Sequence, residues 1–320
     1  MALSLGAEGV SHLEGGQWEA SVNYRYLYAD EGYIGDRIDP TYKRTIGAQL
    51  TLHSIDVQAT YAFNPRFSAT LTIPFFSGEI ASYRDHENDG IHRHTVSAGG
   101  LGDVRLVGNV WLLDPDKHKD GNISLGIGVK APTGDEAATD TFHKTTGLET
   151  RPVDIAIQPS DGGWGIVLEL IGYQKIIDRL YGYVAGSYLI NPREQNSAYT
   201  TIPIYGAVRN LSVPDQYLGR VGITYAIWPE KGLSLSFGGR IDGIPARDLI
   251  GGSEGFRRPG FSVYVEPGVS WARGKNTFNL FTPVLVDANR ERNIYDDRFG
   301  GHGPGAFADY VIIASFTRRL

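Results

Sequence analysis

Charged side chains recur at alternate positions in several stretches whose intervening residues are apolar. Successive side chains of an extended strand point to opposite faces, so these charges would share the face away from the apolar one. If that face lines a narrow pore, opposed charges would set its bore and ion selectivity; in a filled interior they would neutralise one another. Both signs are present, so no anion or cation preference follows. The candidates are Glu19, Arg25, Asp56, Asp103, Arg105, Lys130, Glu169, Arg220, Arg240, Asp242 and Glu266.

A second group of charges lies in the glycine-rich segment 243–260. Glycine lets backbone fold tightly, and Arg257 and Arg258 could pair with Asp242 or Asp248. We expect a fixed loop at the mouth of a pore. This loop could form a constriction or contact a ligand at the entrance, or it could have only an architectural role. The mouth-loop candidates are Arg247, Asp248, Arg257 and Arg258.

The segment 85–94 is rich in imidazole and carboxylate groups, which are ligands of zinc and copper. His92 and His94 would share one side of an extended segment, and His86 would be a third, weaker candidate. A solvated external loop explains the same residues. We therefore predict no metal site, and nothing in the sequence calls for a cofactor.

A membrane-embedded lipid hydrolase would need a base beside a nucleophile, and we expect no Gly-x-Ser-x-Gly nucleophile elbow in this chain. His53 and Ser54 are adjacent, which puts them on opposite faces of a strand. The chain has no cysteine, which excludes a thiol nucleophile, a thiolate metal site and a disulfide framework. We expect no enzyme, and we keep lipid hydrolysis as the lesser alternative.

Alternation of apolar and polar residues predicts the strands that carry these groups. The alternation is clearest at 18–28, 55–63 and 67–73. It is weakest near 164–190, where Val167 and Ile171 fall on the polar face. No stretch shows a capped helix with apolar period 3.6. Further strands are expected near 103–113, 122–131, 164–175, 180–190, 216–228, 232–242, 261–271, 276–286 and 307–319.

The connections between these strands alternate strictly between short and long. An up-and-down barrel of the outer membrane has short periplasmic turns and long external loops. Closure is required because an open edge would expose unpaired backbone groups to hydrocarbon. We therefore predict an all-β, transmembrane, antiparallel up-and-down β-barrel of about twelve strands. The short links lie near 64–66, 114–121, 176–179, 229–231 and 272–275, and the long ones near 29–44, 76–102, 132–163, 191–215, 243–260 and 287–306.

Two features of the sequence favour a membrane position for this barrel. Trp18, Trp228 and Trp271 fall at strand ends assigned to the periplasmic side, which suits an interfacial aromatic girdle. The last strand keeps its apolar alternation up to Leu320, as C-terminal insertion signals of outer-membrane barrels do, with Leu in place of the usual Phe. The net charge of -6 argues against nucleic-acid binding.

Three glycine-containing motifs carry a resemblance to a known family. They are Gly99–Asp103, Ala131–Asp135 and the loop Gly243–Gly260. Together they resemble a family of outer-membrane transporters named for the "MetA-pathway of phenol degradation". The resemblance covers most of the barrel and implies a channel that admits aromatic or other hydrophobic compounds. It transfers no residue-level site.

The sequence thus predicts a bacterial outer-membrane protein whose signal peptide has been removed, with an N-terminal periplasmic segment at 1–16 and the barrel at 17–320. Its expected function is passive passage of small solutes. A plugged structural or adhesion barrel, whose external loops bind a partner, is the alternative. The expected partners are outer-membrane lipid, lipopolysaccharide and a small-molecule solute. Solute identity and oligomeric state do not follow from the sequence.

Overall fold

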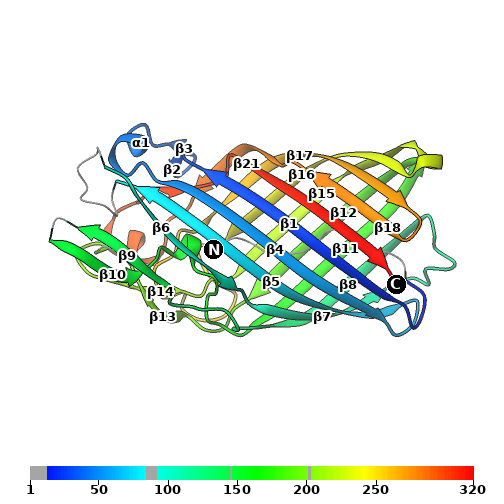
Figure 1. Cartoon of the computed structure of the whole chain (residues 1–320), viewed down its shortest axis with the longest axis horizontal. Helices are drawn as coiled ribbons and strands as arrows, with labels where there is room; N and C mark the ends of the chain where they lie inside the picture. The colour runs from blue at the N-terminus through cyan, green and yellow to red at the C-terminus, as the bar shows by residue number, and fades with distance from the viewer. Residues whose placement is uncertain (1–12, 84–91, 145, 201–202) are drawn as a thin grey trace.

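The computed structural model describes residues 13–83, 92–144, 146–200 and 203–320. Within these ranges, twelve antiparallel strands close into one barrel (Figure 1). Two of the twelve are interrupted, so each consists of two segments. The wall strands are β1 (Trp18–Ala29), β4 (Gln49–Ala62), β5 (Phe67–Ser82), β6 (His94–Leu101) with β7 (Val104–Trp111), β8 (Gly121–Ala131), β11 (Gly165–Ile177), β12 (Leu180–Ile190), β15 (Gln216–Trp228), β16 (Leu233–Ile244), β17 (Gly260–Arg273), β18 (Asn276–Phe281) with β19 (Val284–Arg290), and β21 (Tyr310–Arg319).

The two ends of the chain meet at one seam of the wall. β1 pairs with β21 from Glu19↔Arg319 to Tyr28↔Tyr310 without a register shift. The other wall strands pair with their neighbours in chain order, as an up-and-down barrel requires. The predicted barrel class and strand number are confirmed.

The wall separates an apolar outer face from a polar inner face. On β8, Ile127 is 65% exposed whereas Lys130 is 4% exposed. Val57, Leu71 and Phe237 on other strands are also exposed to the outside. An apolar outer surface of this kind is stable in hydrocarbon, so the alternation in the sequence has the expected cause.

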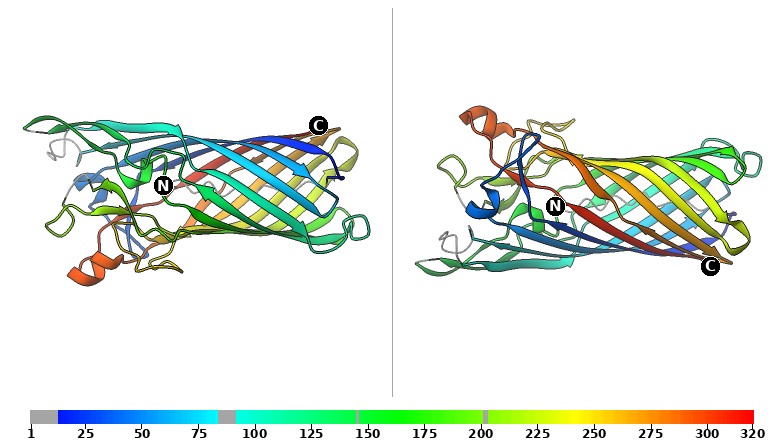
Figure 2. Two further views of the ribbon diagram at one scale, coloured as in Figure 1. Left: turned by 90° about the horizontal axis from the view of Figure 1, so that it is seen from below. Right: turned by 90° about the horizontal axis from the view of Figure 1, so that it is seen from above.

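The short turns lie at one end of the barrel, which we call the turn end, and the long connections lie at the other, the loop end (Figure 2). Trp18, Trp228 and Trp271 are 49%, 51% and 39% exposed and lie at the turn end. Trp271 donates its Nε1–H to the carbonyl of Lys231 at 3.0 Å. The predicted grouping of these tryptophans at one rim is correct.

The predicted long link 76–102 is wrong, because most of it is strand. β5 continues to Ser82, and β6 starts at His94. Polar Ser77 and Glu79 occupy outward positions here, so the apolar half of the alternation disappears. Strands that rise above a bilayer no longer need an apolar outer face.

The side chain of Thr133 bonds to the backbone groups at the break between β6 and β7. At Gly102 and Asp103, Thr133 Oγ1 donates to the Gly102 carbonyl at 2.7 Å and accepts from the Val104 N–H at 3.0 Å. Both backbone groups are therefore satisfied where the ladder stops. Two of the glycine-containing motifs singled out in the sequence thus meet at this point of the wall.

The weakly predicted strands at 164–190 are present as β11 and β12. Val167 and Ile171 do face inward, and they pack with Ala185, Leu189 and Leu218 in an apolar patch on the inner wall. The alternation is interrupted here because the inner wall carries a local apolar patch, although the segment is still a β-strand.

The loops contain smaller elements: β2 (Gly32–Ile34), β3 (Arg37–Ile38), α1 (Tyr42–Thr45), β9 (Thr139–Lys144), β10 (Gly147–Pro152), η1 (Ile155–Ile157), β13 (Gln195–Tyr199), β14 (Asn210–Ser212), η2 (Pro229–Lys231), α2 (Ile294–Phe299) and β20 (Gly305–Ala306). The expectation of no capped helix with apolar period 3.6 did not anticipate α2, a six-residue helix whose N-terminus is capped. Asn293 Oδ1 accepts from the Asp296 N–H at 2.9 Å, and Asp296 Oδ2 accepts from the Asn293 N–H at 3.0 Å. This Asn-x-x-Asp box was readable in the sequence. No helix among the described residues is long and apolar enough to cross a membrane.

Candidate functional site: cavities and ion pairs inside the barrel

Cavities of different character follow one another inside the barrel. A loop-end pocket of about 290 Å³ shares Leu50, Ile155 and Arg258 with a middle cavity of about 150 Å³. A third cavity, of about 370 Å³, lies at the turn end beside Trp111 and shares no lining residue with the middle one. The two upper cavities are therefore neighbours, whereas the turn-end cavity is separate from the middle one.

Between the middle and turn-end cavities lies a group of buried ion pairs that we call the lumen belt: Arg220, Glu266, Arg240 and Asp242. Arg220 Nε donates to Glu266 Oε1 at 2.7 Å, and Arg240 Nη2 donates to Asp242 Oδ2 at 2.9 Å. Arg240 Nη1 also lies 3.8 Å from Glu266 Oε2, which links the two pairs. Arg240 and Asp242 line the middle cavity and Arg220 lines the turn-end cavity, so the belt separates the two.

The other predicted lumen charges also occur in pairs. Arg105 Nη2 donates to Asp56 Oδ2 at 3.4 Å. Lys130 Nζ lies 3.2 Å from Asp103 Oδ2 and also contacts Asp161. The expected face is correct for these residues, but they form local pairs and not opposed rings. Their predicted role in selectivity stays a prediction.

The remaining lumen candidates are Arg25, Glu169 and Glu19, and each of them lines a cavity. Arg25 lines the middle cavity. Glu169 and Glu19 line a small cavity of about 80 Å³ near the turn end. Leu13, in the described part of the predicted N-terminal segment, is buried in that same cavity. The assignment of 1–16 as a periplasmic segment stays a prediction.

Part of a long loop folds inward and fills the upper lumen; we call residues 153–161 the plug segment. It contains η1, at whose N-terminus Asp154 Oδ1 accepts the Ala156 N–H at 2.9 Å. Ile157 is fully buried against the inner face of β4 and β5, with Leu52 among its neighbours. A Cβ at Gly78 would lie 2.7 Å from Ile157 Cγ2, so glycine is required for this approach.

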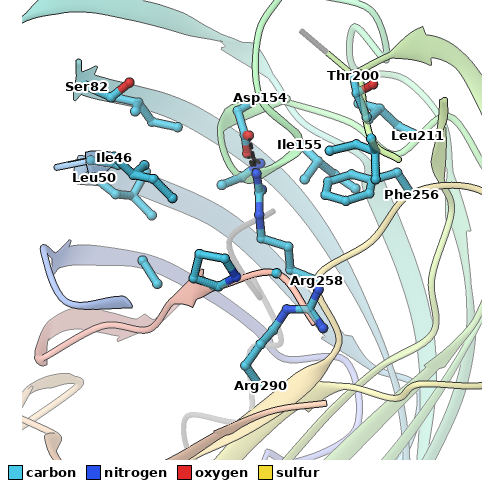
Figure 3. Close-up of a pocket in the computed structure, with 18 of the residues that line it drawn as sticks. Ile46, Leu50, Ser82, Asp154, Ile155, Thr200, Leu211, Phe256, Arg258 and Arg290 are labelled. Carbon is cyan, nitrogen blue, oxygen red and sulfur yellow. Dashed lines mark hydrogen bonds and ion pairs between the residues drawn. The ribbon is translucent and has the colours of Figure 1, made fainter. Parts of the chain in front are cut away.

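Arginines of the mouth loop hold the plug segment and the rim. Arg258 donates two hydrogen bonds to Asp154, both at 2.7 Å, and this pair spans the pocket (Figure 3). Arg257 Nη1 donates to Asp248 Oδ1 at 2.6 Å, one of the two partners expected for it. Arg247 pairs with Asp297 at 2.7 Å. The expected pairing of Arg258 with Asp242 or Asp248 is wrong, because Asp154 of the plug segment is its partner.

The Asp154–Arg258 pair predicts an acid response. Burial would raise the pKa of Asp154, but Arg258 and the Ala156 N–H together lower it to about 2. This pKa is below the ordinary value of 3.8. The pair therefore stabilises the folded plug segment fully above pH 3.8, and this stabilisation is lost as the pH falls toward about 2. We expect bilayer currents to be constant from neutral pH to about pH 4 and to rise below about pH 3. Asp154→Asn should show raised current already at neutral pH, and an unchanged acid response in that variant would assign the response to another group.

The loop-end pocket has an apolar wall with a few polar groups. Ile46, Leu50, Ile155, Leu211 and Phe256 supply much of the apolar lining (Figure 3). The charged groups of the lining are Asp154, Arg258, Arg290 and Asp296. A mostly apolar cavity with a small set of placed polar groups is the usual form of a small-molecule site.

The predicted absence of a metal site meets no contrary observation in the part of the chain that the structure describes. His86 lies outside the described residues. His94 stacks on His143 with ring centroids 3.7 Å apart, and no group of three metal-ligating residues occurs in the described ranges. His92, like His94, is described and belongs to no such group.

For the hydrolase alternative, the chain contains one nucleophile motif, but neither His53 with Ser54 nor this motif forms a catalytic pair. His53 is exposed on the outside, where its Nδ1 lies 2.8 Å from Tyr24 Oη, whereas Ser54 is buried inside. The expected absence of a Gly-x-Ser-x-Gly pattern is wrong, because the mouth loop contains this pattern at 251–255. Ser253 has φ 60°, as strained nucleophile turns do. Its Oγ, however, accepts the Asp248 N–H at 2.8 Å, and no strand–turn–helix surrounds it.

Several site residues were missed because they fall in segments that were predicted to be loops. Asp154, Asp161 and Arg290 line the cavities together with the predicted residues. One signal was available: Ile155-Ala156-Ile157 is an apolar run within a long, otherwise polar link, which favours a buried segment. Asp161 had no comparable signal, because its partners Lys130 and Asn191 are distant in the sequence.

Comparison with solved structures shows what the barrel is similar to. An outer-membrane channel from Pseudomonas putida F1 matches with TM-score 0.64 and 12% identity over 100% of both chains. The translocator domain of the autotransporter NalP from Neisseria meningitidis matches with TM-score 0.49 and 10% identity, over 98% of this chain and 91% of that one. The P. putida toluene transporter TodX matches with TM-score 0.43 and 8% identity, over 96% and 91%.

No protein-family model and no curated protein matches the sequence. The resemblance to the phenol-degradation family therefore stays a prediction. The similarity to the first channel over the full length of both chains shows the fold, which agrees with the predicted outer-membrane location. This chain is a closed twelve-stranded β-barrel similar to those of bacterial outer-membrane channels.

Proposed function

We propose that this chain is a channel that takes small, largely apolar solutes, aromatic compounds included, across the outer membrane by passive diffusion. The observation that carries the proposal is the apolar loop-end pocket, which borders the middle cavity and shares lining residues with it. An outer-membrane channel fold supports a transport role, and the pocket supports the solute class. No cofactor or energy input is part of the proposal.

The pocket size supports capture of a single-ring molecule. A cavity of about 150 Å³ suffices for benzene, and this pocket measures about 290 Å³. Burying about 150 Å² of aromatic surface at about 25 cal/mol/Å² gives about 4 kcal/mol, which corresponds to roughly millimolar affinity. Binding of this strength suits a channel, because a solute must leave as well as enter.

Passage requires the plug segment or the lumen belt to move. The plug segment lines both upper cavities through Ile155 and Ala156, so its displacement would join them and widen the upper part of the lumen. The belt below consists of side chains on rigid strands. We infer that the plug segment is the moving part and that the belt sets the size limit.

The test combines conductance with uptake. Purified, heat-modifiable barrel in planar bilayers should give discrete openings, and liposomes containing it should admit phenol faster than protein-free liposomes. Glycerol, polar and slightly smaller than phenol, serves as the matched solute and should enter more slowly than phenol. Folded protein that gives neither openings nor phenol entry would contradict the proposal.

The plug segment also favours a second candidate, a structural barrel whose external loops bind a partner. A filled lumen needs no solute, and β9–β10 and β13–β14 extend at the loop end (Figure 1). The same bilayer experiment separates the two, since a structural barrel would remain silent. Outer-membrane lipid and lipopolysaccharide stay the proposed surroundings of the outer wall in either case.

A further inference from the structure

Arg290 in the loop-end pocket is buried with unused hydrogen-bonding capacity. The residue is 1% exposed. Its Nη2 donates to Asp296 Oδ2 at 3.2 Å, but its Nε and Nη1 have no partner among the described residues. A buried guanidinium with unpaired N–H groups is costly, so a molecule that accepts hydrogen bonds there would be stabilised.

The two arginines of the pocket differ in how fully their charge is matched. Arg258 makes a bidentate pair with Asp154, with both bonds at 2.7 Å. Asp296, the partner of Arg290, also accepts the Tyr205 O–H at 2.7 Å and the Asn293 N–H at 3.0 Å. Because its oxygens serve three donors, Asp296 compensates Arg290 less completely than Asp154 compensates Arg258.

The unmatched donors lie beside an apolar wall. Arg290 lines the same pocket as Ile46, Leu50 and Phe256, and Figure 3 shows it below Arg258 in this cavity. Tyr205 and Ile204 also line the pocket and belong to the loop that follows β13. The site therefore offers an apolar surface for a ring and a cationic donor for one oxygen-bearing group.

We propose that the loop-end pocket binds small amphipathic carboxylates of about one ring, with the carboxylate on Arg290 and the ring against the apolar wall. This inference rests on the proposed function and narrows its solute class from apolar to apolar with one anionic end. A carboxylate has the geometry and charge to accept from a guanidinium, and charge-assisted bonds are the stronger kind. The Asp154–Arg258 pair, already matched, would orient the plug segment and leave the anion to Arg290.

The experiment measures binding by calorimetry on the folded barrel in detergent, with benzoate as probe and benzyl alcohol as its uncharged counterpart. Benzoate should bind wild type at least tenfold more tightly than benzyl alcohol. Arg290→Met should weaken benzoate at least tenfold and change benzyl alcohol less than threefold, whereas Arg290→Lys should retain intermediate affinity for benzoate. Arg247→Met is the matched control, because it removes a positive charge from the same mouth without touching the pocket lining.

Each outcome bears on the proposal. Equal benzoate affinity in wild type and Arg290→Met would overturn it, and so would an equal loss in Arg247→Met, which would indicate general charge attraction. Inorganic phosphate that competes as well as benzoate would also overturn it, since the ring would then contribute nothing. Heat-modifiable migration checks the fold of each variant, and Arg290→Lys keeps the test decisive if the Met variant does not fold. Channel openings without benzoate binding would reject this inference and leave the proposed function standing.

Discussion

Glu266→Gln is expected to lower the free energy of unfolding of the barrel by about 3–5 kcal/mol, because it leaves buried arginines without their counter-charge. Glu266 is fully buried, and both Arg220 and Arg240 lie within ion-pair distance of its carboxylate. Removing one member of a buried ionic group costs far more than the net contribution of the intact group. Urea titration of the folded fraction in detergent or lipid, followed by gel migration, measures the change.

Asp178→Asn is the control for this substitution. Asp178 pairs with Arg179 on an exposed turn, with 86% of its side chain accessible, so its removal should leave the titration midpoint unchanged within error. Equal midpoints for Glu266→Gln and wild type would mean that water reaches the belt and compensates the arginines. The belt would then be no barrier between the middle and turn-end cavities.

Replacing residues 155–159 by a short Gly-Ser link is expected to raise single-channel conductance several-fold. The replaced residues include η1, whose Ile155 and Ala156 line both upper cavities, so their removal joins these cavities into a wider vestibule. The barrel should survive, because the wall strands pair with one another independently of the plug segment. Planar-bilayer recordings at fixed salt measure the change.

A point substitution tests the same idea without deletion. Gly78→Leu should force Ile157 off the inner wall, since even a Cβ would lie 2.7 Å from its Cγ2. The chain has no native cysteine, so Ile157→Cys in the Gly78→Leu background should react with a thiol reagent faster than Ile157→Cys alone. Gly108→Leu, at a wall glycine whose nearest contact is an ordinary 3.8 Å, is the control and should leave that rate unchanged. Unaltered conductance in the deletion would show that the belt alone limits flow.

The wall was predictable from the sequence because one physical rule governs it. Every wall strand must present apolar residues to lipid and polar ones to the lumen, and this requirement repeats at each second residue. The rule placed Lys130, Arg220 and Glu266 on the inner face. It failed at Ser77 and Glu79, where β5 is still strand but no longer needs an apolar outer side.

The loop-end pocket was not predictable in the same way. The ion pair that spans it joins residues far apart in the chain: Asp154 and Arg258 are separated by 104 residues. No periodic rule connects such positions, because their contact depends on how each loop folds back over the lumen. The charged residues of the mouth loop were identified, but the partner of Arg258 and the role of Arg290 required the three-dimensional structure.

The seam between β1 and β21 has a consequence for how the barrel is made. Most wall pairs join strands that are neighbours in the chain, so hairpins can form early with small loop-closure entropy. The β1–β21 pair joins Glu19 to Arg319 and cannot form until nearly the whole chain has been gathered. We therefore expect pairing of β1 with β21 to be the slow, final step of folding. Substitutions in this seam should slow formation of the closed barrel more than the same substitutions in any internal hairpin.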